Sequence, residues 1–170
     1  TPNLKLIALN AATGKLVWEF DPGLDFSPHV NRGVSYWESK QDKRILYTAG
    51  SLLFAINATT GKPITTFGAA GVTSLKAGLG VRAADLFVIA TSPGVVYNDL
   101  FIIGTRVSEN ADAAPGYVRA FDILTGNVEW IFHTIPKPGE YGYSTWPKDA
   151  YNQIGGANGW AGISLDKKRG

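Results

Sequence analysis

Short apolar runs separated by clusters of Gly, Asn, Asp and Ser recur along the whole chain. Examples are the segments 44–48, 52–56 and 100–103, which are rich in aliphatic and aromatic residues. Runs of this length between turn-forming residues predict β-strands. No stretch of about 11 residues has the periodicity of an amphipathic helix, so the pattern predicts an all-β fold.

One segment occurs three times and orders these strands. The pattern Ala-x-Asn/Asp-x-x-Thr-Gly begins at Ala8, Ala55 and Ala120, and the first and third copies continue to Trp18 and Trp130. The Asn or Asp side chain favours a turn by bonding to its own backbone, and Gly supplies the positive φ that closes the turn. Each copy therefore predicts a hairpin that forms the last two strands of a sheet, with a large aromatic residue to pack on the neighbouring repeat.

A second hairpin precedes each of the later copies. The segment 33–37 can pair with 44–48, and 95–97 can pair with 100–103. Four strands in a period of about 45 residues are typical of a β-propeller blade. The second copy is the weakest, because Thr65 stands at the position of the tryptophan.

The chain is therefore predicted to be a single unit, residues 1–170, of partial β-propeller with antiparallel four-stranded blades. We expect a half blade at 4–20, whole blades at 33–67 and 93–132, and the start of another blade at 160–170. Propellers close with typically four to eight blades, so we expect a piece of a longer protein. Unpaired sheet edges also predict that the piece can associate with copies of itself.

The stretches between these blades, 68–92, 106–116 and 133–159, are expected to be long loops that carry function or move.

The composition of the chain excludes several classes of function and site. Sixteen basic and 14 acidic residues give a net charge of +2, and the basic residues are scattered, so binding to nucleic acid is not implied. The absence of cysteine excludes disulfides, thiolate metal sites and cysteine nucleophiles. No apolar run reaches about 18 residues, so no membrane span is expected within the chain.

The repeated motif is similar to the tryptophan-docking motif of pyrroloquinoline quinone (PQQ) dehydrogenases, which are eight-bladed propellers. Three segments extend the resemblance over nearly the whole chain. The segment 30–37 resembles the one whose Arg holds the PQQ carboxylates, and 103–110 resembles the loop that gives the metal ion an acidic ligand. The segment 155–160 resembles the one whose Trp stacks under the quinone ring. Non-enzymatic propellers of the same superfamily carry the docking motif too, so a scaffold or binding domain is the alternative.

The resemblance implies that Arg32 and Trp160 bind PQQ, that Thr91 hydrogen-bonds the quinone, and that Glu109 or Asn110 binds its calcium or magnesium ion. Blade geometry supports this independently, because the loop before a first strand and the loop after a second strand open on one face, where these groups would converge. Taken singly, the arginine could form a salt bridge, the glutamate could be a solvated acid, and the tryptophan could be a core residue.

His29 is a further candidate for PQQ binding. It lies three residues before Arg32, where some sugar-oxidising relatives also carry a histidine. The alcohol-oxidising relatives have two adjacent cysteines here, which form a disulfide against PQQ, whereas this chain has Ser-Pro-His at 27–29. The departure favours the glucose, quinate or polyol type. A role in capping a loop is the alternative for His29.

The implied reaction oxidises a sugar, polyol or alcohol by hydride transfer to metal-bound PQQ, with a general base taking the hydroxyl proton. The resemblance places that base, an Asp, beyond Gly170. No catalytic residue is therefore assigned in this chain, and we expect the isolated chain to be inactive. Asp85, Asp99, Asp112 and Asp149 do not match the position of the base. The relatives imply a periplasmic parent, possible membrane anchoring by a segment outside this chain, and ubiquinone or cytochrome c as the electron acceptor.

Overall fold

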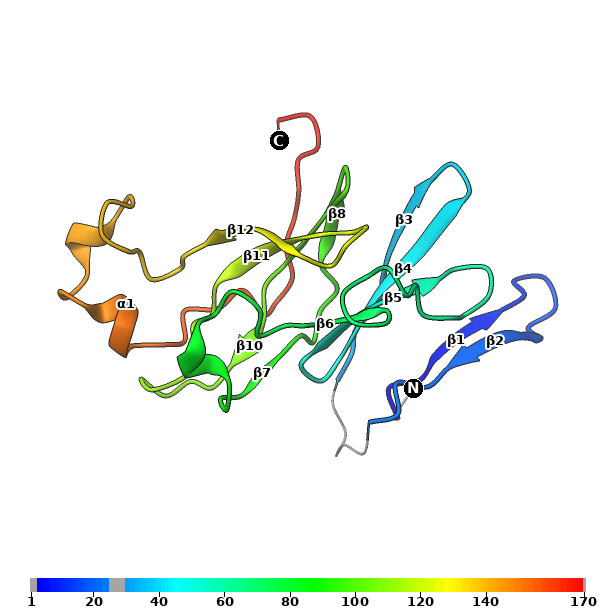
Figure 1. Cartoon of the computed structure of the whole chain (residues 1–170), viewed down its shortest axis with the longest axis horizontal. Helices are drawn as coiled ribbons and strands as arrows, with labels where there is room; N and C mark the ends of the chain where they lie inside the picture. The colour runs from blue at the N-terminus through cyan, green and yellow to red at the C-terminus, as the bar shows by residue number, and fades with distance from the viewer. Residues whose placement is uncertain (1–2, 25–29, 170) are drawn as a thin grey trace.

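The computed structural model describes residues 3–24 and 30–169, and Figure 1 shows them as a row of antiparallel sheets with very little helix. The first sheet pairs β1 (Leu6–Leu9) with β2 (Leu16–Phe20). The second has the order β3 (Ser35–Ser39), β4 (Asp42–Ala49), β5 (Leu52–Asn57) and β6 (Val72–Ser74). The third has the order β12 (Val128–Phe132), β11 (Val118–Asp122), β9 (Leu100–Ile103) and β8 (Val95–Tyr97).

Three short pieces complete the structure. β7 (Val88–Ile89) pairs with β10 (Arg106–Val107) in a fourth, two-stranded sheet. Two single turns of 3₁₀ helix span Val81–Ala83 and Tyr143–Thr145, and the only α-helix in the described residues is α1 (Ala150–Gln153). The prediction of an all-β fold built on antiparallel four-stranded sheets is confirmed.

The second sheet extends beyond the blade limits of 33–67 that the sequence predicts. Its last strand is β6, which pairs Leu52 with Ser74, and near the predicted fourth strand there is only an isolated bridge between Ile56 and Pro63. Proline has no N–H to donate and a fixed φ, so the ladder cannot continue through Pro63. The chain leaves the sheet there and returns with β6, so the stretch 68–92 is not simply a loop.

The first hairpin and the third sheet lie within their predicted limits, whereas the stretches 106–116 and 160–169 differ from the prediction. The first hairpin lies within 4–20, and the third sheet lies within 93–132. The stretch 106–116 contributes β10 and is therefore not wholly loop either. Residues 160–169 form no strand, because no strand of the described chain pairs with them. A strand needs a hydrogen-bonded neighbour, and the predicted first strand of a further blade is thus not formed here.

Trp18 connects the first hairpin to the second sheet. Its indole Nε1 donates to the carbonyl oxygen of Ala58 at 3.0 Å. The ring lies flat on Gly61, where a Cβ atom would come within 2.7 Å of it. The glycine of the Thr-Gly turn, whose φ is +70°, is thus needed both for the turn and for the contact with the indole.

Phe67 makes the matching contact between the second and third sheets. Its ring packs against Gly126 of the next Thr-Gly turn, and the backbone N–H of Gly68 donates to the carbonyl oxygen of Thr125 at 2.8 Å. Thr65, which aligns with the tryptophan in sequence, is not the docking residue. The excursion of the chain after Pro63 shifts the docking aromatic by two positions.

The main hydrophobic core lies between the second and third sheets, and a smaller one joins the first hairpin to the second sheet. Arg119 is fully buried in the main core, where it donates hydrogen bonds to the carbonyl oxygens of Leu75 and Ala77 and to Oγ1 of Thr105. Burial lowers the pKa of Arg119 to about 10. This side chain ties the loop after β6 to the segment after β9.

Candidate functional site

A pocket of about 780 Å³ lies where four separate stretches of the chain meet. Its walls are Val30, Arg32 and Thr91, the loop 106–111, and the segment 154–158 with Trp160. The volume falls in the range of roughly 300–1,000 Å³ that is usual for small-molecule sites. Five residues predicted from separate blades thus line one pocket: Arg32, Thr91, Glu109, Asn110 and Trp160. His29 lies outside the described residues.

Arg32 precedes β3 and is fixed through its backbone. Its N–H donates to the carbonyl oxygen of Thr91 at 3.0 Å, and the neighbouring Asn31 side chain donates to the carbonyl oxygen of Thr48 at 2.6 Å. The Arg32 guanidinium carbon lies 6.0 Å from the ring centroid of Trp160, which is within cation–π range. No carboxylate of the described residues is paired with Arg32, so the salt-bridge alternative finds no partner.

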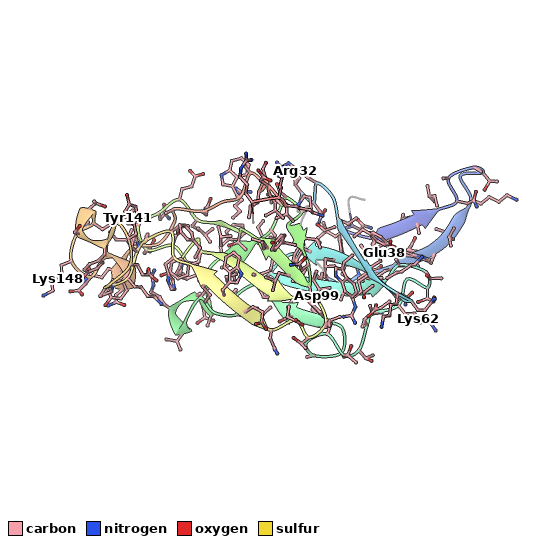
Figure 2. The ribbon with its side chains drawn as sticks, turned by 90° about the horizontal axis from the view of Figure 1, so that it is seen from above. Arg32, Glu38, Lys62, Asp99, Tyr141 and Lys148 are labelled. Carbon is pink, nitrogen blue, oxygen red and sulfur yellow. The ribbon has the colours of Figure 1, made fainter. Side chains whose placement is uncertain are left out.

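Figure 2 shows Arg32 on one face of the molecule, with Asp99 and Lys62 on the opposite face. Asp99 instead accepts a hydrogen bond from the indole of Trp37 at 3.1 Å. It is therefore a structural residue at the contact between the second and third sheets.

Thr91 brings an unpartnered hydroxyl to the pocket. The residue is buried, and its Oγ1 has no hydrogen-bond partner among the described residues. A buried polar atom without a partner costs about 1–3 kcal/mol, so such atoms are rare and call for an explanation. Because Oγ1 is itself buried, a ligand with a polar atom would supply the missing hydrogen bond once the Thr91 side chain turns its hydroxyl toward the pocket.

Residues 155–159, which precede Trp160, approach the neighbouring segment backbone to backbone, with no side chain between them. A side chain at Gly155 would clash with the carbonyl of Ala113, and one at Gly104 would clash with the carbonyl of Gly159. The Gly155 N–H also donates to the carbonyl oxygen of Ala111 at 2.9 Å. These close approaches hold residues 155–159 against residues 104–116 and bring the indole to the pocket.

Trp160 itself is 48% exposed in this chain. Its indole forms part of the pocket wall, beside the guanidinium of Arg32. A half-exposed indole face in a pocket is suited to stacking on a planar ring.

Glu109 and Asn110 follow β10 and are exposed to the pocket. Their oxygens are of the kind that calcium and magnesium prefer. The described residues contain no group of three or more His, Cys, Asp or Glu side chains that could hold a metal ion. The chain thus offers the side-chain oxygens of Glu109 and Asn110 at this wall.

Arg106 is a pocket residue that sequence reasoning missed. It lies on β10, opposite Ile89 of β7, and its guanidinium carbon lies 5.8 Å from the ring centroid of Phe87. No motif residue stands at its position, and the pairing of β10 with β7 that brings Arg106 to the pocket is evident only in the structure.

Comparison with known proteins shows the family of the chain. The family model "Glucose/ethanol/alcohol dehydrogenase, beta-propeller domain", a PQQ family, matches residues 1–170. The chain belongs to this family. The prediction of a partial β-propeller related to PQQ dehydrogenases is thereby confirmed.

Individual relatives agree with the family model. The chain is 31% identical to the quinoprotein glucose dehydrogenase of Escherichia coli over 187 residues, which is 99% of this chain and 23% of the relative. It is 32% identical to the alcohol dehydrogenase (quinone) dehydrogenase subunit of Gluconacetobacter polyoxogenes over 180 residues, which is 94% of this chain and 23% of the relative. The chain spans about a quarter of these relatives, and the two identities do not separate a sugar from an alcohol type.

A solved structure supports the fold at the level of coordinates. The quinohemoprotein alcohol dehydrogenase from Comamonas testosteroni superposes with a TM-score of 0.60 at 26% identity, covering 80% of this chain and 19% of that chain. In the described part of this chain, no helix is long and apolar enough to cross a membrane.

Proposed function

We propose that the protein carrying this chain is a PQQ-dependent dehydrogenase that oxidises a sugar, polyol or alcohol, and that the pocket described above holds PQQ. One observation carries the proposal. This chain, a member of the family, brings four chemical groups into one pocket from separate parts of the fold. They are a guanidinium and a buried hydroxyl without partners among the described residues, a half-exposed indole and a carboxylate, from Arg32, Thr91, Trp160 and Glu109.

The residues present fit a planar tricarboxylate. The fork of Arg32 can bind a carboxylate through two parallel hydrogen bonds, and no acidic side chain of the described residues competes for it. Trp160 offers a flat apolar surface for the ring system, and Thr91 offers a hydroxyl that has no other partner.

Glu109 or Asn110 would bind the divalent cation, calcium or magnesium, that accompanies PQQ. When bound, PQQ supplies the two-electron acceptor of the oxidation. The part of this chain in the reaction is to hold and orient that group with Arg32 and Trp160 and to place an acidic oxygen beside it. Asp85, Asp99, Asp112 and Asp149 do not line the pocket, so we propose that the general base lies outside this chain and that the isolated chain is inactive.

We further propose that the parent protein works in the periplasm and passes electrons to ubiquinone or cytochrome c. The names of two relatives support the electron acceptor, because one is a quinone dehydrogenase and the other a quinohemoprotein. The periplasmic location rests on the sequence resemblance alone. A membrane anchor, if the parent has one, is assigned to a segment outside this chain.

The test is a titration of the full-length protein with PQQ at a fixed calcium concentration, followed by quenching of tryptophan fluorescence. Arg32→Ala should weaken binding by about 10- to 100-fold, the usual worth of a charged hydrogen-bonded pair. The matched control is Arg169→Ala, because Arg169 is exposed and paired with Asp166. Equal affinity of Arg32→Ala and the control would refute the assigned pocket, and no binding by the unaltered protein would favour a non-enzymatic scaffold.

A further inference from the structure

We propose that Arg106 is a second carboxylate-binding residue of this pocket, and that Arg32 and Arg106 together select a ligand with at least two anionic groups. The inference rests on the proposed function, because the ligand considered is PQQ, which carries three carboxylates. It adds a residue that neither the sequence motifs nor the family match assigns.

The hydrogen bonding of the six arginines in the chain sets two of them apart. Arg44 and Arg169 are paired with Asp42 and Asp166. The guanidinium groups of Arg82 and Arg119 donate to backbone carbonyl oxygens. In the described residues, the side chains of the remaining two, Arg32 and Arg106, have no hydrogen-bonded or ion-paired partner, and both line the pocket.

Aromatic rings support these two guanidinium groups. Arg32 lies over Trp160 and Arg106 lies over Phe87, at 6.0 and 5.8 Å from the ring centroids. A cation–π contact holds a guanidinium in place without an anion to compensate its charge. The N–H groups, which lie in the plane of the guanidinium, stay free to donate hydrogen bonds. Both side chains are therefore oriented and still able to bind an anion.

The backbone anchors both arginines to one short segment, residues 89–91. Arg106 pairs with Ile89 on β7, and Arg32 donates its N–H to the carbonyl of Thr91, two residues further along. Two residues of extended chain span roughly 6–7 Å. Backbone anchors at this spacing allow the two guanidinium groups to reach two carboxylates at different edges of one ring system.

The charge of the pocket agrees with this assignment. Its wall carries two arginines and one acid, Glu109, so the pocket is positive before any metal ion is bound. A ligand with one carboxylate would leave one guanidinium without an anionic partner. A polycarboxylate would engage both.

The experiment compares PQQ with its trimethyl ester on the full-length protein, by equilibrium fluorescence titration at fixed calcium concentration. Arg106→Gln should weaken PQQ binding about 10- to 100-fold and should change binding of the uncharged ester less than about threefold. It should also reduce the salt dependence of PQQ binding. Arg106→Lys keeps the charge and should recover part of the affinity, and Arg169→Gln is the matched control.

Each outcome decides one point. Unchanged PQQ affinity in Arg106→Gln, or an equal loss for PQQ and its ester, would overturn the role of Arg106 while leaving the proposed function standing. No PQQ binding by the unaltered protein would instead refute the proposed function. If Arg106→Gln does not fold, Arg106→Lys and the ratio of PQQ to ester affinity in the unaltered protein decide: a ratio near one would overturn the inference.

Discussion

Replacing Thr91 by valine should make the free protein more stable and its complex with PQQ weaker. Thr91 is 4% exposed, and its Oγ1 has no hydrogen-bond partner among the described residues. Valine has nearly the same shape, so Thr91→Val removes an unsatisfied polar atom without leaving a cavity. A structural threonine would behave in the opposite way, because its substitution would remove a hydrogen bond.

The magnitude follows from the cost of burying a polar group. An unsatisfied hydroxyl costs about 1–3 kcal/mol, and a well-formed neutral hydrogen bond contributes about 0.5–1.5 kcal/mol. Thr91→Val should therefore raise the free energy of unfolding of the PQQ-free protein by about 1 kcal/mol. The same substitution should weaken PQQ binding by about 0.5–1.5 kcal/mol, which is roughly two- to tenfold.

The assay pairs urea denaturation of the PQQ-free protein with the fluorescence titration. Thr105→Val is the control, because Oγ1 of Thr105 accepts a hydrogen bond from Arg119 and the residue is not in the pocket. This control should lower the stability of the protein and leave its affinity for PQQ unchanged. If Thr91→Val lowered stability and left PQQ affinity unchanged, the hydroxyl would be a structural group and our interpretation of the pocket would fail.

Trp18→Ala should cost about 3–5 kcal/mol in urea denaturation, because its ring is buried on the next blade, whereas Trp160→Ala should cost less than about 1 kcal/mol and abolish most PQQ binding. If Trp160→Ala cost more stability than Trp18→Ala and left PQQ binding intact, Trp160 would be the structural residue. Gly155→Ala should destabilise by about 1–3 kcal/mol and weaken PQQ binding, and Gly159→Ala, whose added methyl would meet only a side chain at 3.7 Å, should be tolerated in both assays. Burial raises the pKa of Tyr47 from 10.0 to about 12, so its contribution to stability is full below pH 10 and is lost as the pH rises to 12; a Tyr47→Phe variant should lack that loss, and identical pH profiles would contradict it. The isolated 170-residue chain should associate with itself, and a monodisperse monomer in sedimentation would exclude this.

Local turn chemistry made much of the fold predictable. Asn10, Asn57 and Asp122 each accept hydrogen bonds from backbone N–H groups two and three residues further on, as the repeated motif predicts. The Thr-Gly glycines have φ values of +69°, +70° and +77°. These features depend on a few adjacent residues, so the sequence alone was enough to predict them.

Pairing between distant segments was harder to predict. The fourth strand of the second sheet was placed wrongly, because Pro63 interrupts a ladder whose continuation depends on the return of residues 72–74. Phe67 took the docking position for the same reason. Arg106 was missed because its place in the pocket depends on the pairing of β10 with β7, two strands of two residues each that carry no sequence signal of their own.

The most direct test of the account is a crystal structure of the full-length protein with PQQ and calcium. The account predicts a planar ring against the indole of Trp160, a carboxylate on the guanidinium of Arg32, and the metal ion beside Glu109 or Asn110. PQQ bound at another face of the protein, with Arg32 and Trp160 still in contact with each other, would contradict it.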